Sequence, residues 1–118
     1  MKKSTKTYFS FLSIMFTLLF LSSNAFASDF EGSWLLNDTH GGSFVATLDH
    51  DGTASGTHGD SMKHGTWTEK DGSAIIKWNT GWTTCISKDG QKYVKTSFKP
   101  GSSLTDPPTD KSDAKKKN

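Results

Sequence analysis

Short runs of alternating apolar and polar residues, separated by glycine-rich turns, cover the chain from about residue 30 to residue 100. Within Ser43–His50, Phe44, Ala46 and Leu48 would share one face of an extended chain, and the residues between them the other. This period of two is typical of half-buried strands, and no stretch of the same region shows a helical period. We therefore expect seven strands, at Gly32–Asn37, Ser43–His50, Thr53–His58, His64–Glu69, Ala74–Asn79, Trp82–Lys88 and Lys92–Lys99.

Three Asp-Gly pairs, Asp51-Gly52, Asp71-Gly72 and Asp89-Gly90, mark tight hairpin turns, because both residue types tolerate positive φ angles. Short strands joined in this way predict an all-β antiparallel meander. Four tryptophans are too many for a flat sheet with one wet face. We expect the sheet to curl into a small barrel or a tight sandwich that buries them and removes the open edges. The segment Gly59–Lys63 is the least regular connection, and we expect it to be mobile.

The two ends of the chain differ from the strand-rich middle. Residues 1–27 combine three early lysines, an apolar run and a final Ala25-Phe26-Ala27, which is the order of a secretory signal peptide. From residue 101 the chain is rich in Ser, Pro, Asp and Lys and poor in apolar residues. The sequence therefore predicts a signal peptide (1–27), a β-barrel domain (28–100) and a disordered polar tail (101–118).

Composition narrows the classes of partner. All 14 strongly basic residues are lysines, so the bidentate recognition of phosphate or guanine that arginine provides is absent. Three lysines belong to the leader, which leaves the mature part close to neutral. We expect an exported protein, periplasmic or secreted, that binds no nucleic acid, keeps no stable membrane anchor after cleavage and is a monomer. The single cysteine, Cys85, forms no internal disulfide, and we expect a buried, inert thiol.

Several short motifs resemble those of a known group of β-barrels. Glu31-Gly32-Ser33-Trp34 is similar to the Gly-x-Trp that opens lipocalin-like barrels. The later series Gly65-Thr66-Trp67, Ile76-Lys77-Trp78 and Gly81-Trp82 resembles the rhythm of small exported bacterial lipocalin-like proteins. The resemblance covers roughly residues 29–100 and implies a small barrel. Some lipocalin-like proteins are protease inhibitors, which implies a second function, with Ser28–Glu31 at the new N-terminus as the inhibitory segment.

The tryptophans also suggest a binding site. Trp78 and Trp82 flank the turn-like Asn79-Thr80-Gly81, and an exposed aromatic ring beside a turn often belongs to a binding surface. Core packing is the alternative for both rings. We expect a non-catalytic protein that binds a small apolar ligand or a protein partner at one end of the barrel. Trp78, Trp82 and Met62 are the candidate contacts, with Gly59–His64 as an adaptable lid.

A third hypothesis is copper or zinc binding. His58, Asp60 and His64 lie close together in the sequence, and imidazole is a common ligand of both metals. Their spacing matches no closed structural zinc pattern, so loop histidines without a metal are the alternative.

Catalysis is not expected, and neither is a cofactor. Gly59-Asp60-Ser61-Met62 is similar to the Gly-Asp-Ser-Leu block of a hydrolase family. That family needs a larger α/β fold with a distant Asp-His pair, whereas this segment lies between short strands. A polar turn is the simpler interpretation of these four residues.

Overall fold

The computed structural model describes residues 28–117, and the predicted signal peptide lies outside these described residues. The described part contains eight strands. Their bounds are β1 (Gly32–Asn37), β2 (Ser43–Leu48), β3 (Thr53–His58), β4 (Ser61–Lys70), β5 (Ser73–Trp78), β6 (Thr83–Asp89), β7 (Lys92–Phe98) and β8 (Asp110–Lys116). No helix in this part of the chain has the length and apolar character needed to cross a bilayer.

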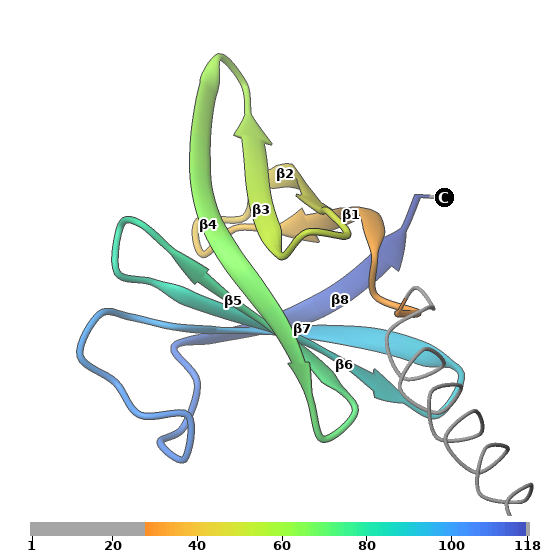
Figure 1. Ribbon diagram of the computed structural model, residues 1–118. Coiled ribbons are helices and arrows are strands. Elements are labelled where there is room, and N and C mark those ends of the chain that lie inside the picture. The colour runs from red at the N-terminus through yellow and green to blue at the C-terminus, as the bar shows by residue number, and fades with distance from the viewer. Residues whose placement is uncertain (1–27, 118) are drawn as a thin grey trace, which may run out of the picture.

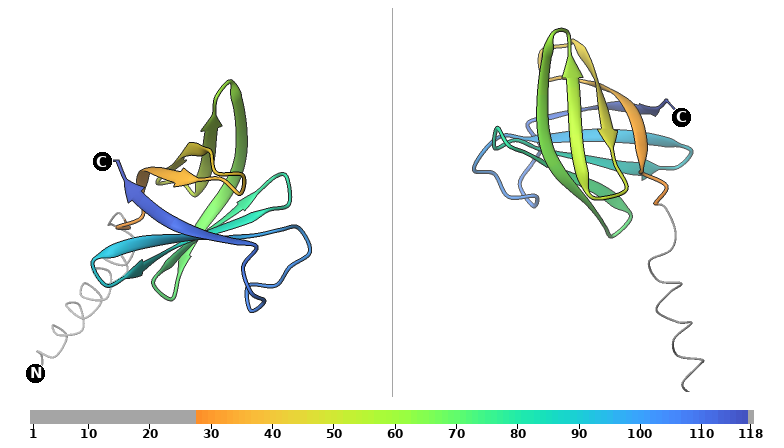
Figure 2. Two further views of the ribbon diagram at one scale, coloured as in Figure 1. Left: turned by 180° about the vertical axis from the view of Figure 1, so that it is seen from behind. Right: turned by 45° about the horizontal axis from the view of Figure 1, so that its top comes forward.

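Each strand pairs antiparallel with the next, and β8 pairs with β1 to close the barrel (Figures 1 and 2). The closing register places Trp34 opposite Lys116 and Leu36 opposite Ala114. A closed meander leaves no free strand edge. The predicted all-β antiparallel barrel is therefore confirmed, with eight strands in place of seven.

The eighth strand corrects the prediction of a disordered tail for residues 101–118. Residues 110–116 form β8, which pairs with both β7 and β1. The sequence did not indicate this strand because Ala114 is the only buried residue of Asp110–Lys116, so no alternation of apolar residues is visible. Backbone hydrogen bonds to two neighbouring strands hold it, and these bonds do not depend on apolar side chains.

The connection between β3 and β4 is also tighter than expected. His58 pairs directly with Ser61, so Gly59 and Asp60 alone form the turn, and Gly59 has the positive φ of 62° that such a turn needs. The segment Gly59–Lys63 is therefore not the irregular connection that was predicted, because β4 begins at Ser61 and not at His64. At the opposite end of β4, Asp71 and Gly72 both have positive φ, as the Asp-Gly signal predicts.

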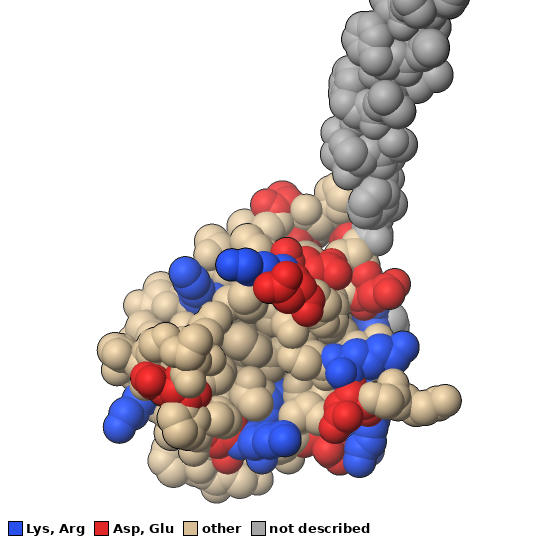
Figure 3. Space-filling view, turned by 90° about the horizontal axis from the view of Figure 1, so that it is seen from below, with Lys and Arg blue, Asp and Glu red and all other residues tan. Residues whose placement is uncertain are grey.

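The inward-facing residues of all eight strands fill the barrel. The largest of the side chains that are almost completely buried are Trp34, Leu36, Leu48, Ile76, Ile86 and Lys95. Gly65 of β4 allows a close approach to β5, because an added Cβ would overlap with the carbonyl oxygen of Lys77. Acidic and basic side chains are intermixed on the face of the molecule seen in Figure 3.

The two ends of the barrel differ. The plugged end carries the N-terminal segment 28–31 and the connections 49–52, 71–72 and 90–91, of which 71–72 and 90–91 lie at the bottom and lower right of Figure 1. The open end carries the connections 38–42, 59–60, 79–82 and 99–109, which lie toward its top and left. Phe30 closes the plugged end: it is 4% exposed and packs against Trp34 and Tyr93.

Candidate functional site

A pocket of about 290 Å³ lies at the open end of the barrel. Its walls come from the connections 38–42 and 79–82 and from the inner faces of β2, β4, β5, β6 and β7. The lining residues are Asp38, Thr39, His40, Phe44, Lys63, Trp78, Thr80, Trp82, Thr84, Lys95 and Ser97. Aromatic rings, hydroxyl groups and two lysines therefore face the same space.

Two tryptophans and a phenylalanine form the aromatic side of this pocket. Trp78 ends β5 with its ring inside the barrel, where it is 4% exposed and meets the Phe44 ring at a steep angle. Its Nε1 donates a hydrogen bond to Thr84 Oγ1 at 2.9 Å. Trp82 is half-buried in the following connection, which is held by a backbone bond from Trp78 N to Trp82 O. Trp78 is thus fixed, and Trp82 presents part of its ring.

The ammonium group of Lys63 lies against the aromatic side of the pocket. It faces inward from β4, opposite Gly56 of β3, whose lack of a side chain leaves room for the lysine stem and the Trp78 ring. Its Nζ lies 4.4 Å from the centre of the Phe44 ring and 4.8 Å from the Trp78 ring. Desolvation is the main cause that lowers the pKa of Lys63, and Lys95 adds to it, whereas Asp38 opposes the shift. Cation–π contacts with two rings support the charge in this half-buried position.

Lys95 lies deeper and already has its partners. Its side chain is 1% exposed, and its Nζ is 2.9 Å from Asp110 Oδ2 and donates to the backbone oxygen of Asn37. A charge this deep is tolerated only when it is paired and hydrogen-bonded. Lys95 therefore joins β7 to β1 and β8 at the base of the pocket.

The rim of the pocket is fixed by Asp38. Its Oδ1 accepts hydrogen bonds from the backbone nitrogens of His40 and Gly42, each at 2.8 Å. Its Oδ2 lies 2.9 Å from His58 Nε2 of β3. The hydrogen bond from His40 is the largest cause that lowers the pKa of Asp38. The carboxylate thus folds the β1–β2 connection onto itself and ties it to β3.

The candidate ligand contacts separate in the structure. Trp78 and Trp82 line the open-end pocket together. Met62 does not line it: the side chain is on the outer face of β4, opposite Thr57, and is 58% exposed. Alternation along the strand explains the difference, because an inward Lys63 places its neighbour Met62 outside. The lid predicted for Gly59–His64 is instead part of a regular hairpin.

The candidate metal ligands are not brought together. His58 is on the inner face near the rim and contacts Asp38, whereas His64 pairs with Ser55 on the outer face. Asp60 is in the turn between the two strands. Across residues 28–117, no three His, Cys, Asp or Glu side chains are grouped so that they could hold a metal ion.

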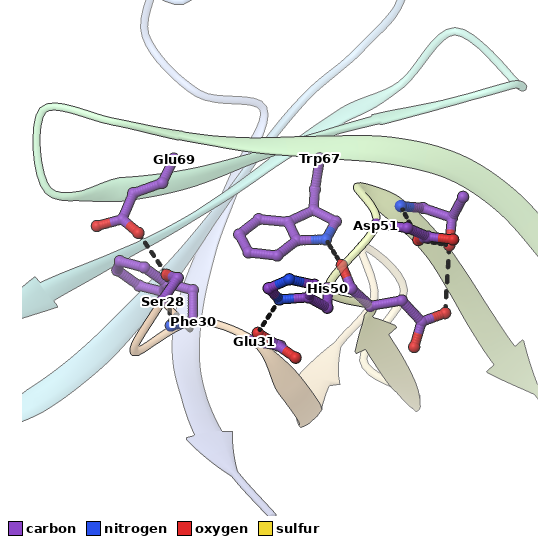
Figure 4. Close-up of polar contacts among 9 residues, drawn as sticks. Ser28, Phe30, Glu31, His50, Asp51, Trp67 and Glu69 are labelled. Carbon is purple, nitrogen blue, oxygen red and sulfur yellow. Dashed lines mark hydrogen bonds and ion pairs between the residues drawn. The ribbon is translucent and has the colours of Figure 1, made fainter. Parts of the chain in front are cut away.

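Ser28–Glu31, the candidate inhibitory segment, is folded against the plugged end. Phe30 is buried, and its backbone oxygen accepts a 2.9 Å hydrogen bond from Trp34 Nε1. Figure 4 shows Ser28 bonded to Glu69 of β4, and Glu31 facing His50 at 3.2 Å. Such a segment does not protrude in the way an inhibitor that enters an active site requires.

Cys85 is buried in β6, as the sequence predicts, with 8% of its surface exposed. Burial raises the pKa of its thiol, so the reactive thiolate form is disfavoured. The thiol therefore contributes packing to this strand and lies outside the pocket.

Lys63, Phe44, Asp38 and Lys95 are pocket residues that the sequence reasoning missed. A signal existed for Lys63, because Lys63, Gly65 and Trp67 have the same parity and Trp67 was expected inside the barrel. The strand was expected to begin at His64, so Lys63 was assigned to the preceding connection and its inward orientation was not recognised. The position of Asp38 depends on a turn that closes through its own side chain, and the sequence pattern gives little indication of that.

The chain matches no protein-family model, and comparisons with curated proteins and with solved structures find no significant match.

Proposed function

We propose that the protein is a non-catalytic binding protein that takes a small molecule into the open end of its barrel. The observation that carries this proposal is the contrast between the two ends. Phe30 closes one end, while the other holds a pocket whose wall includes the half-buried Trp82. Concave sites with apolar walls and a few polar groups are the usual form of small-molecule sites.

The size of the pocket limits the ligand. Its volume of about 290 Å³ is just below the usual range for ligand pockets, about 300 to 1,000 Å³. The rest of the barrel interior is occupied by packed side chains such as Trp34, Leu36 and Ile86. The ligand that fits is therefore small, of the size of one aromatic ring with a short chain, and only part of it would be enclosed.

A role without catalysis is part of this proposal, and the contacts of Asp38 and His58 support it. Asp38 and His58 are in contact, but the Asp38 oxygens also accept two backbone hydrogen bonds that shape the rim. Among the hydrogen bonds of the described residues, His58 has no serine or cysteine partner of the kind that a histidine-activated nucleophile would need. We therefore assign the Asp38–His58 contact a structural role in the proposed binding site.

Nuclear magnetic resonance on the mature protein tests this proposal. The probes are 4-phenylbutanoate and its neutral amide, 4-phenylbutanamide, titrated into ¹⁵N-labelled protein. We expect at least one probe to shift the indole N–H signals of Trp78 and Trp82 and the backbone signals of residues 38–40. Trp82→Ala should weaken binding about tenfold or more, because it removes the most accessible part of the aromatic wall.

Leu35→Ala is the control, since Leu35 is an exposed apolar residue on the outer face of β1, away from the pocket. It should leave the affinity unchanged. The proposal fails if neither probe binds at millimolar concentration, or if the shifts map to another face of the barrel.

A further inference from the structure

We propose that the ligand of the open-end pocket is a small amphipathic monoanion, a carboxylate on an apolar group, with Lys63 as its counter-charge. This inference rests on the proposed function, because it names the chemical class that the same pocket would take. The carboxylate would lie beside Lys63 Nζ and the apolar group against Trp82 and Trp78.

Lys63 lacks the compensation that a charge in its position normally has. Within residues 28–117 its Nζ forms no ion pair, and the contacts that it makes are with the faces of two aromatic rings. Half-buried charges are usually paired, because loss of hydration is otherwise uncompensated. An anion entering the pocket would supply the missing partner, and the desolvation of the lysine would strengthen that contact.

The other charged groups of the pocket are already engaged. Lys95 has its charge balanced by Asp110, and Asp38 is bound to His58 and to two backbone nitrogens. The Asp38 carboxylate is therefore held on the side of the pocket formed by β1 and β3. This leaves Lys63 as the group with free hydrogen-bonding capacity toward the side formed by β5, β6 and β7.

A buried hydroxyl on that side adds a second donor. Thr84 is 4% exposed and lines the pocket, and its oxygen accepts the hydrogen bond from Trp78 Nε1. Because the indole N–H can only donate, the hydroxyl hydrogen of Thr84 remains available to an acceptor. One ammonium group and one hydroxyl suit a carboxylate, whereas a phosphate dianion would need more positive charge.

The test compares the affinities of 4-phenylbutanoate and 4-phenylbutanamide, which differ in charge but hardly in shape. We expect the wild-type protein to bind the carboxylate about tenfold more tightly at pH 7. Lys63→Met keeps an unbranched apolar stem and should abolish this preference, so that the variant binds the two probes with equal affinity. Lys77→Met, an exposed lysine on the outer face of β5, should keep the preference.

A second measurement needs no variant. The ¹³Cε signal of Lys63, followed against pH, should report a pKa raised by about one unit when 4-phenylbutanoate is bound, since a tenfold preference corresponds to one unit. The amide should leave it unchanged. Equal affinities for the two probes, or a carboxylate preference that survives Lys63→Met, would overturn the inference while the binding function stands. If neither probe binds, the proposed function itself fails.

Discussion

Lys95 Nζ lies 2.9 Å from Asp110 Oδ2, and this ion pair joins β7 to β8 inside the barrel. The two residues are on the inner faces of adjacent strands, since Lys95 pairs with Ser112 and Asp110 with Ser97. Lys95 is almost fully buried, whereas the Asp110 side chain is 29% exposed. The polar C-terminal strand therefore does more than close the sheet: it supplies the acid that a buried lysine needs.

Replacement of Asp110 by alanine should destabilise the protein by about 3 kcal/mol. This is at the lower end of the range for breaking a buried pair, because Asp110 is partly solvated. Urea unfolding followed by tryptophan fluorescence measures the change. Asp113→Ala is the matched control: Asp113 is exposed on the outer face of the same strand, so its loss should alter stability by no more than about 0.5 kcal/mol.

The paired variant sharpens this test. Lys95→Met combined with Asp110→Ala removes both charges, and much of the stability lost in Asp110→Ala should return, because no unpaired charge remains inside. Equal stability of the Asp110→Ala and Asp113→Ala proteins would mean that Asp110 does not compensate Lys95.

The Lys95–Asp110 pair illustrates why β8 could not be predicted from the sequence whereas the other strands could. Strands such as Ser43–Leu48 carry apolar residues at every second position, so their burial could be read from the chain. In Asp110–Lys116 the inward positions are Asp110, Ser112, Ala114 and Lys116, and three of these four are polar. The inward position of Asp110 depends on its ion pair with Lys95 of β7, and a local pattern contains no information about that partner.

The site was predictable to a similar extent. Trp78 and Trp82 were recognised because aromatic rings beside a turn are visible in the sequence, and both line the pocket. The strand-start error at β4 exchanged the roles of two neighbours: Met62 was expected in the site, whereas Lys63 occupies it. Because β4 begins at Ser61, residues 61–63 belong to the strand, and the side-chain period of two places Lys63 inside the barrel and Met62 outside it.

Phe30→Ala tests the role of the N-terminal segment as a plug. Phe30 is 4% exposed between Trp34 and Tyr93, so truncation should leave a cavity and cost about 3 to 4 kcal/mol. Thermal unfolding of the mature protein measures this loss. Leu35→Ala, a truncation at a position 39% exposed, should cost well under half as much. Similar melting temperatures for Phe30→Ala and wild type would show that the segment does not seal the barrel.

Protonation of the Asp38 carboxylate should lower the stability of the protein in acid. Hydrogen bonds from His40 and Gly42 hold its pKa below the ordinary 3.8, so at low pH the unfolded chain binds more protons than the folded one. The stability that Asp38 provides is therefore complete above pH 3.8 and is lost as the pH falls through the lower, folded-state pKa. Asp38→Asn should be less stable than wild type at pH 6, and the two melting temperatures should converge toward pH 2.5. Asp60→Asn, the same charge change in the β3–β4 turn, should show no such convergence.

Deprotonation of Lys63 should raise the stability of the protein at alkaline pH. Burial and the nearby Lys95 hold its pKa below the ordinary 10.5, and Asp38 opposes them, so folding favours loss of the proton. The protonated lysine therefore costs stability at neutral pH, and this cost disappears as the pH rises through the folded-state pKa toward 10.5. Lys63→Met should match or exceed the wild type at pH 7, by less than about 1 kcal/mol, since the thioether keeps contacts with the two rings.

The gain from Lys63→Met should shrink as the pH approaches 10.5, because the wild-type lysine then loses its proton in the folded state and no longer places a charge beside the two rings. The other charged or titratable groups around the pocket are common to both proteins, so the difference between them isolates Lys63; these groups are Asp38, His40, His58, Lys95 and Asp110. Guanidinium unfolding from pH 7 to 10.5 measures it, with Lys77→Met as the exposed control. A Lys63→Met protein clearly less stable than wild type at pH 7 would mean that the two cation–π contacts outweigh the desolvation, and an anion would then not be needed to compensate Lys63.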